Sequence, residues 1–163
     1  MMVEDTEFQI ANDTRKFEIT LFWQRSLFFA GFISVTFVGY STLRAEPLFQ
    51  FMLSVFGLVC SLVWFLANKG SKFWQENWEG HIALTATEKK HKLFSDLYRT
   101  KKNGLFCATR FSPSKLAIAL SFYVTMLWVL LSGISFIALD KNLRWIAIVI
   151  FSTSIIFSIW VLF

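Results

Sequence analysis

The chain has 163 residues, of which 55% are hydrophobic, 18% aromatic and only 17% charged. With a mean hydropathy of +0.53, it carries more apolar surface than a soluble domain of this length can bury. Its net charge of +5 is gathered in a few stretches, which excludes the evenly charged surface of a soluble protein. We therefore predict an all-α membrane protein that has the lipid bilayer as its environment.

Residues 1–25 form the predicted cytoplasmic N-terminal segment, which contains an amphipathic helix. Cap-type residues open this helix, and Phe17 and Leu21 recur at the spacing of one helical turn. Glu18 and Arg25 are seven residues apart and share a face where the helix meets the headgroups. Arg25 then either extends its charge to the membrane surface or pairs with an acidic residue of a neighbouring helix.

Four uncharged segments have the length needed to cross about 30 Å of hydrocarbon, which takes about 20 residues. Because they lack charge, they leave no polar face of the kind that a soluble four-helix bundle requires. They form two transmembrane hairpins, over residues 26–67 and 116–163, separated by a cytoplasmic helical loop at 68–115. The predicted spans are Ser26 to Leu43, Pro47 to Ala67, Leu116 to Leu139, and Trp145 to Phe163.

Positive charge predicts the orientation of these spans, because Lys and Arg resist translocation. Of the 16 Lys and Arg residues, three lie in the N-terminal segment, one in the first hairpin turn, ten in the central loop and two in the second turn. The central loop is therefore expected in the cytoplasm, together with both termini. This indicates a multi-pass protein of the bacterial inner membrane.

The stretch after the second span predicts a helix that continues into the cytoplasm to about Ile82. Trp74 and Trp78 are one turn apart. The polar groups that can bind a second helix through hydrogen bonds are Gln75, Glu76, Asn77 and Glu79. We expect this stretch to pack against the N-terminal helix; the alternative is an aromatic anchor at the interface. A further helix is expected around residues 87–100. The residues predicted to pack in the oligomer or its cytoplasmic layer are Arg15, Phe17, Glu18, Trp23, Arg25, Trp74, Asn77, Trp78 and Glu79.

Hydroxyl side chains line one face of the third span. Ser121, Thr125, Ser132 and Ser135 fall within a sector of about 80° at 100° per residue. They form either a helix-packing stripe or the lining of a pore. Small residues recur in the other spans as well, namely Gly31, Ser34 and Ser41 in the first span and Gly57 and Ser61 in the second.

Chemistry-bearing motifs are absent from the sequence. His81 and His91 are ten residues apart without a cysteine partner, so no metal site is expected. Cys60 and Cys107 fall at different depths, so no disulfide is expected. Phosphate-binding loops and nucleophile elbows are missing, and no signature of a nucleic-acid-binding fold accompanies the basic loop. We therefore predict neither an enzyme nor a cofactor, and no binding to nucleic acid.

Two motifs together suggest a family. Residues Thr14 to Arg25 lead into the first span, and Lys72, Trp74, Glu76, Asn77, Trp78 and Glu79 follow the second. This combination resembles the RipA family of octameric bacterial membrane proteins. The resemblance implies four inner-membrane spans, cytoplasmic termini and a homo-octamer. It also implies a kinship with small membrane proteins that occur beside anti-phage genes as membrane-damaging effectors.

Two functional hypotheses follow. The first is a ring-like homo-oligomer that alters membrane permeability, or acts as a membrane effector in stress or phage defence. The second is a non-conducting scaffold that forms the same ring and recruits a cytoplasmic protein partner.

Overall fold

The computed structural model describes residues 2–43, 45–88 and 112–162. All regular secondary structure in these residues is helical, and four of the helices are long and apolar enough to cross a membrane. The elements are α1 (Met2–Thr42), α2 (Pro47–Glu88), α3 (Pro113–Ala138), the short 3-10 helix η2 (Lys141–Leu143) and α4 (Arg144–Leu162). The fold is therefore an all-helical one with four candidate spans.

The two prolines of the chain each occupy the first position of a long helix. At that position the fixed φ of proline suits the helix, and its missing N–H would have no intrahelical acceptor. The turn before Pro47 is held by the Glu46 N–H, which donates to the Leu43 carbonyl at 3.1 Å. Before Pro113, Ser112 is extended (φ −78°, ψ 117°). Neither α1 nor α2 contains an internal proline, so both continue unbroken for about 40 residues.

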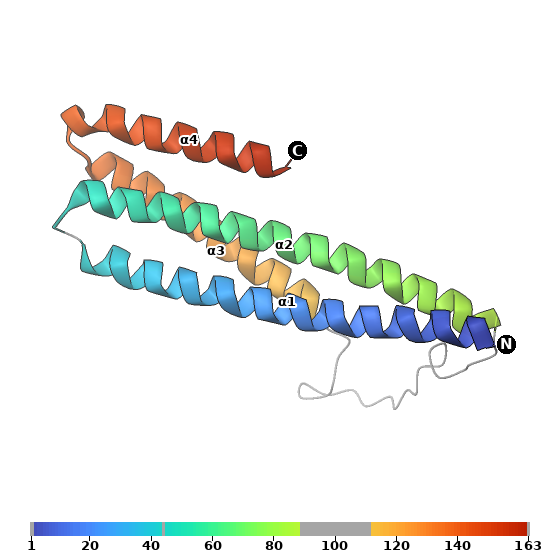
Figure 1. Cartoon of the computed structure of the whole chain (residues 1–163). Coiled ribbons are helices and arrows are strands. Elements are labelled where there is room, and N and C mark those ends of the chain that lie inside the picture. The colour runs from blue at the N-terminus through green and yellow to red at the C-terminus, as the bar shows by residue number, and fades with distance from the viewer. Residues whose placement is uncertain (1, 44, 89–111, 163) are drawn as a thin grey trace, which may run out of the picture.

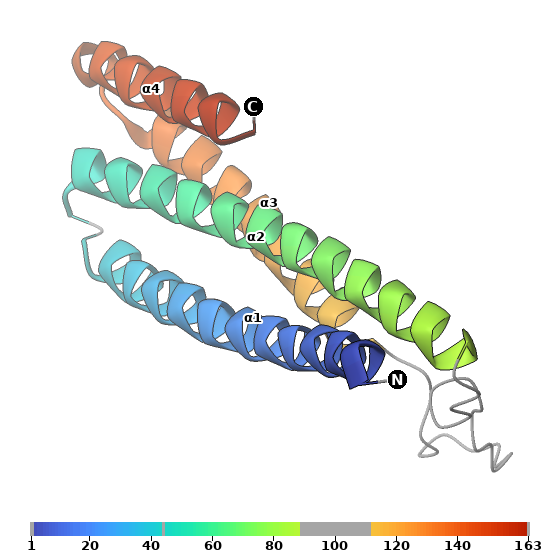
Figure 2. The ribbon, with the colours of Figure 1, turned by 45° about the vertical axis from the view of Figure 1, so that its right-hand side comes forward.

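Helix α2 is the centre of the molecule, with α1 and α3 packed along it (Figures 1 and 2). Its buried side chains follow a spacing of alternately three and four residues, which keeps them on one face of a helix. We call this face the α2 stripe; it consists of Ser54, Gly57, Ser61, Trp64, Asn68, Ser71, Gln75, Trp78 and Ile82, all buried except the half-buried Trp78.

Helix α4 lies at the edge of the bundle, and in the described part of the chain it packs mainly against α2 and the preceding turn. Phe51 and Val55 of α2 meet Leu139 and Ala147 in a small apolar cluster. The Arg144 guanidinium donates to the Leu139 carbonyl at 3.2 Å, which satisfies one of the free carbonyls at the end of α3. Most of α4 beyond this point is exposed.

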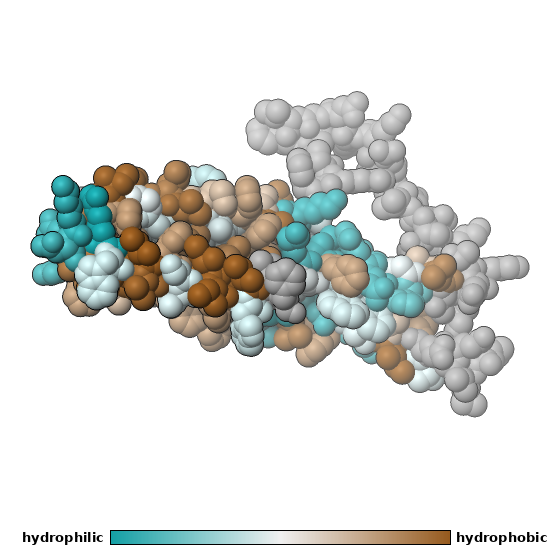
Figure 3. Space-filling model, turned by 90° about the horizontal axis from the view of Figure 1, so that it is seen from above, coloured by the Kyte–Doolittle hydropathy of each residue, from teal (hydrophilic) through white to brown (hydrophobic). Residues whose placement is uncertain are grey.

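Hydrophobic and hydrophilic side chains separate along the length of the molecule. Figure 3 shows hydrophobic atoms over its middle and hydrophilic atoms at both ends. One end carries the two short turns, with Glu46, Asp140 and Lys141 exposed. At the other end α1 and α2 run on together past the charge-free segments. We call this extension the arm; it comprises residues 6–25 of α1 and 69–84 of α2.

The predicted boundaries at residues 25 and 67 both fall inside continuous helices. The predicted segments therefore share helices, and the predicted boundaries are positions within a helix. The predicted helix at 87–100 lies outside the described residues, apart from its first two positions, which belong to α2. Lys115, the last residue of the predicted cytoplasmic loop, is the third residue of α3.

Candidate functional site

The amide of Asn68 ties three helices together at the boundary between the spans and the arm. Ser26 of α1 donates its hydroxyl to Asn68 Oδ1 at 3.2 Å, and Asn68 Nδ2 donates to Ser121 Oγ of α3 at 3.2 Å. The same Nδ2 contacts the Ala117 carbonyl at 3.3 Å, and the Trp64 indole N–H donates to Ser26 Oγ at 3.4 Å. Asn68 is only 2% exposed. Both the oxygen and the nitrogen of its amide are therefore hydrogen-bonded to other helices.

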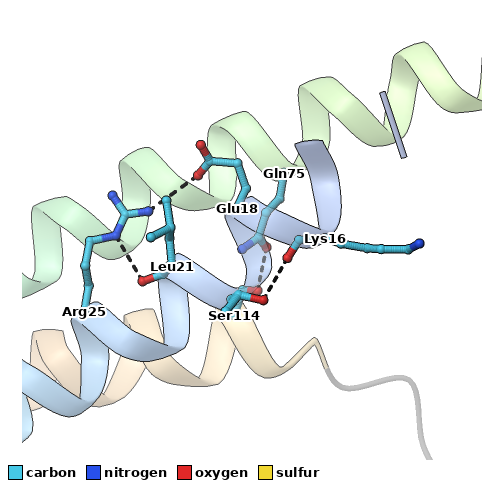
Figure 4. A network of polar contacts seen from close by, with 7 residues as sticks. Lys16, Glu18, Leu21, Arg25, Gln75 and Ser114 are labelled. Carbon is cyan, nitrogen blue, oxygen red and sulfur yellow. Dashed lines mark hydrogen bonds and ion pairs between the residues drawn. The ribbon is translucent and has the colours of Figure 1, made fainter. Parts of the chain in front are cut away.

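A second buried amide lies two helical turns further along α2. Gln75 is 4% exposed, and its Oε1 accepts a hydrogen bond from Ser114 Oγ at 2.9 Å (Figure 4). Ser114 is the second residue of α3. This contact fixes the start of α3 against α2, within the arm.

A salt bridge joins the two helices of the arm. Arg15 of α1 pairs with Glu79 of α2 at 3.2 Å, with side chains 32% and 47% exposed. Arg15 lies 11 residues before Ser26, and Glu79 lies 11 residues after Asn68. Because these two contacts have the same separation on both helices, α1 and α2 run antiparallel in matched register along the arm.

Arg25 pairs within its own helix. Its guanidinium lies 3.5 Å from Glu18 and also donates to the Leu21 carbonyl at 3.2 Å (Figure 4). Within one protomer the partner of Arg25 is thus Glu18, one heptad earlier on α1. A pair with an acidic residue of a neighbouring helix remains a prediction. The Arg25–Glu18 pair is half exposed and stands at the end of the charge-free segment.

Four other residues predicted to pack in the oligomer or the cytoplasmic layer are exposed in the single protomer. These are Phe17, Trp23, Trp74 and Asn77. Trp23 and Trp74 each make an edge-on ring contact with the aromatic residue before them, Phe22 and Phe73 respectively. Trp78, in contrast, is half-buried on the α2 stripe, with its ring 5.8 Å from that of His81. As contacts between subunits, the exposed four remain predictions.

The hydroxyl stripe of α3 faces into the protomer. Ser121, Thr125, Ser132 and Ser135 are between 0% and 4% exposed. Thr125 and Ser132 donate to carbonyls of their own helix, and Ser135 Oγ lies 3.0 Å from the Tyr40 hydroxyl of α1. Within the single protomer these hydroxyls are buried, an arrangement typical of helix packing. A pore lining in the assembly remains a prediction.

Trp128 of α3 fills the space inside this stripe and is fully buried. Its ring stacks on Phe37 of α1, with centroids 4.3 Å apart. A Cβ placed at Gly57 would lie 2.5 Å from the Trp128 ring, so only glycine admits the indole at this point. Within the described part of the chain, the indole N–H has no hydrogen-bond partner.

The sequence pattern does not single out Asn68 or Trp128. The predicted second span ends at Ala67, so Asn68 is expected in the cytoplasmic loop, whereas the structure buries it. The detectable signal was the spacing of the α2 stripe, which continues through Asn68 without a change of period from the apolar segment into the arm. The partner helices that bury these residues cannot be read from that spacing.

An apolar cleft of about 400 Å³ lies between α2, α3 and α4. Phe51, Val129, Phe136 and Ile148 are among its lining residues, and Ser132 reaches its edge. The cleft offers no titratable group for chemistry. In the described ranges, no three His, Cys, Asp or Glu residues come together in a way that could hold a metal ion.

Comparison with known proteins gives one match. The sequence model of the octameric membrane protein family (8xMP) matches residues 6–139, which include all of α2 and α3 and nearly all of α1 and end before α4. No curated protein and no solved structure matches the chain.

Proposed function

We propose that this chain, which belongs to the octameric membrane protein family, forms an octamer that acts as a scaffold. The scaffold holds a layer of paired helices at the cytoplasmic face of a bacterial inner membrane. In this proposal the layer consists of the arms, and it recruits a cytoplasmic protein partner. The observation that carries the proposal is the α2 stripe, which runs without a break from the apolar segment into the arm.

Three contacts support a stiff arm. The Asn68 amide holds α1 and α3 at the base, Gln75 holds the start of α3, and the Arg15–Glu79 salt bridge joins the helices further out. Each contact crosses between helices. A surface that must present the same shape in every copy of a ring requires fixed relative positions of this kind.

The distribution of positive charge supports a cytoplasmic arm. Ten of the 16 Lys and Arg residues lie between residues 69 and 115, while the two turns at the opposite end carry three. Cysteines placed at Ala45 and at Asn77 test this orientation in intact cells, in a background that lacks the native cysteines. An impermeant maleimide is expected to label the cysteine at 45 only; labelling at 77 alone would place the arm outside.

Dye and ion flux test the scaffold. Octamers reconstituted into vesicles are expected to leave an entrapped dye and an ion gradient intact. The charge reversal Glu79→Arg is expected to weaken biological activity while the octamer persists, and the exchange Arg15→Glu with Glu79→Arg to restore it. Flux through the unmodified octamer would contradict a purely structural role.

Altered permeability, in stress or phage defence, is the second candidate. Gly31, Ser34 and Ser41 favour it, because they lie exposed on the charge-free part of α1. An octamer that closes around this face would line its axis with small and hydroxyl side chains. In that case Ser34→Leu would abolish flux, whereas Ser158→Leu on α4, equally a serine in an apolar helix, would not.

A further inference from the structure

Large apolar side chains are exposed on the arm, beyond the reach of lipid. Leu84 is 69% exposed and lies 16 residues beyond Asn68, about 24 Å further along the helix. The headgroup layer is only about 5–8 Å thick on each side. Because α2 is unbroken, it cannot turn to lie on the membrane surface. Because the predicted second span ends at Ala67, lipid is expected to solvate the exposed residues of the spans but not Leu84.

Exposed residues of α2 in the arm follow a heptad pattern on the side away from α1 and α3. We call this face the α2 seam; it consists of Gly70, Phe73, Asn77, Gly80 and Leu84, all exposed. Alternate spacings of three and four residues are typical of a helix that packs against another helix. The α2 seam lies nearly opposite the α2 stripe on the helix circumference, at 100° per residue.

The two glycines of the α2 seam indicate a close neighbour. Glycine weakens the interior of a helix, and in the described part of the chain no atom lies within 4 Å of a Cβ placed at Gly70 or Gly80. The single protomer therefore gives no steric reason for glycine at either position. Approach of a second helix would give one, because glycine lets large side chains of a partner come close to the backbone.

Helix α1 carries the complementary face. Ile10 and Phe17 are 58% and 60% exposed and share with Leu21 a side of α1 that is turned away from Arg15 and its partner on α2. We call these three residues the α1 seam. The match to the family model covers residues 6–139 and thus includes both seams.

The two seams agree in height. The register of the arm places residues of α1 and α2 at equal depth when they are equally far from Ser26 and Asn68. Ile10 and Leu84 are each 16 residues away, and Leu21 and Phe73 are each five away. Copies in a ring are related by rotation about the membrane normal and keep the same depth. Neighbouring copies therefore bring these pairs to one level.

Charge is complementary at the margin of the seams. Lys16 lies ten residues from Ser26, and Glu76 lies eight residues from Asn68, so their heights differ by about 3 Å. Both side chains are well exposed, at 65% and 60%, and each has a partner on its own helix that it can share. When the seams face each other, helix handedness puts Lys16 and Glu76 on the same flank.

We propose that the α2 seam of one subunit binds the α1 seam of the next subunit, and that this contact closes the ring of arms. The inference rests on the octameric assembly assumed in the proposed function and adds which surfaces meet. The contact joins two different faces, so it is heterologous and repeats around the ring. The contact is confined to the arm. Within the spans, α4 covers α2 at Phe51 and Val55.

Paired cysteines test the contact in native membranes, in the full chain with Cys60→Ser and Cys107→Ser. Under mild oxidation, Ile10→Cys combined with Leu84→Cys is expected to give a ladder of covalent products of up to eight subunits. Each single variant is expected to remain uncrosslinked. The control combines Ile10→Cys with Gly70→Cys, which uses the same faces at heights about 21 Å apart and exceeds the reach of a disulfide.

Each outcome decides the proposal. A ladder from the Ile10–Leu84 pair alone supports it. Dimers from either single variant would show that a seam meets its own copy, and absence of any ladder would show that the seams do not meet; both overturn it. Mass measurement of the uncrosslinked variants separates a failure of the seam pairing from a failure of the octameric assembly. An octamer without a ladder refutes the seam pairing only, whereas a native chain that is not octameric removes the assembly on which both proposals rest.

Discussion

Helices α2 and α4 both have the length and apolarity of a membrane span, yet they are held in different ways. The most apolar window of α2 is 33% buried, and its α2 stripe carries serine, asparagine and glutamine against α1 and α3. The corresponding window of α4 is 6% buried. In lipid, apolar side chains gain little from leaving one apolar environment for another. The comparison shows that small and polar residues, more than apolar ones, determine which helix faces meet.

The largest expected difference is between two tryptophans, Trp128 of α3, which meets the α2 stripe at Gly57, and Trp160 of α4. Trp128→Ala is expected to lower the free energy of unfolding by about 3–5 kcal/mol, because it opens a cavity in a fully buried site. Trp160 of α4 is 76% exposed, and Trp160→Ala is expected to cost less than about 0.5 kcal/mol. Equilibrium unfolding in mixed micelles measures both.

A third variant separates shape from hydrogen bonding at this site. Trp128→Phe is expected to stay within about 1.5 kcal/mol of the native protein, because the indole N–H that it removes has no partner in the described residues. A loss as large as that of Trp128→Ala would show that the N–H is satisfied in the membrane.

The Asn68 amide should have the next largest effect. Asn68→Leu removes three interhelical hydrogen bonds, which in membrane proteins are worth about 0.6–2 kcal/mol each, so a loss of about 2–4 kcal/mol is expected. Ser158→Ala on α4 is the matched control, because its hydroxyl bonds only to a carbonyl of its own helix. Equal losses of unfolding free energy for Asn68→Leu and Ser158→Ala would contradict the difference proposed between α2 and α4.

The smallest effect is expected at the salt bridge of the arm. Arg15 and Glu79 are both partly exposed, so water screens their attraction, and a double-mutant cycle with alanine is expected to give less than about 1 kcal/mol of coupling. Unfolding of the four proteins in the cycle measures it. Coupling above about 2 kcal/mol would indicate that the pair is desolvated in the octamer.

Much of the fold could be predicted from the distribution of charge. Charge-free stretches of about 20 residues identify the spans because lipid tolerates little else, and the matched family model agrees with the resemblance found in Thr14 to Arg25 and in the Trp74 region. The salt bridge between Arg15 and Glu79 joins two of the residues singled out there. These features depend on local sequence and on the bilayer.

The partners of the buried polar groups could not be predicted. The hydroxyls of α3 have the same pattern whether they face a pore or a helix, and the sequence does not show that Ser121 and Ser135 meet Asn68 and Tyr40 within the protomer. Likewise, α3 and α4 are similarly apolar, but α3 meets the glycine and polar groups of the α2 stripe, and most of α4 does not. Which helices pack together depends on both contacting faces, and the pattern of one segment describes only one of them.

Hydrogen exchange in the arm tests the central claim most directly. If the arm is a stiff continuation of the spans, backbone amides of residues 9–24 and 70–84 exchange slowly in the purified octamer, and Asn68→Leu accelerates exchange on both helices together. Exchange at the rate of isolated helices in the native protein, or acceleration on α2 alone, would contradict the account.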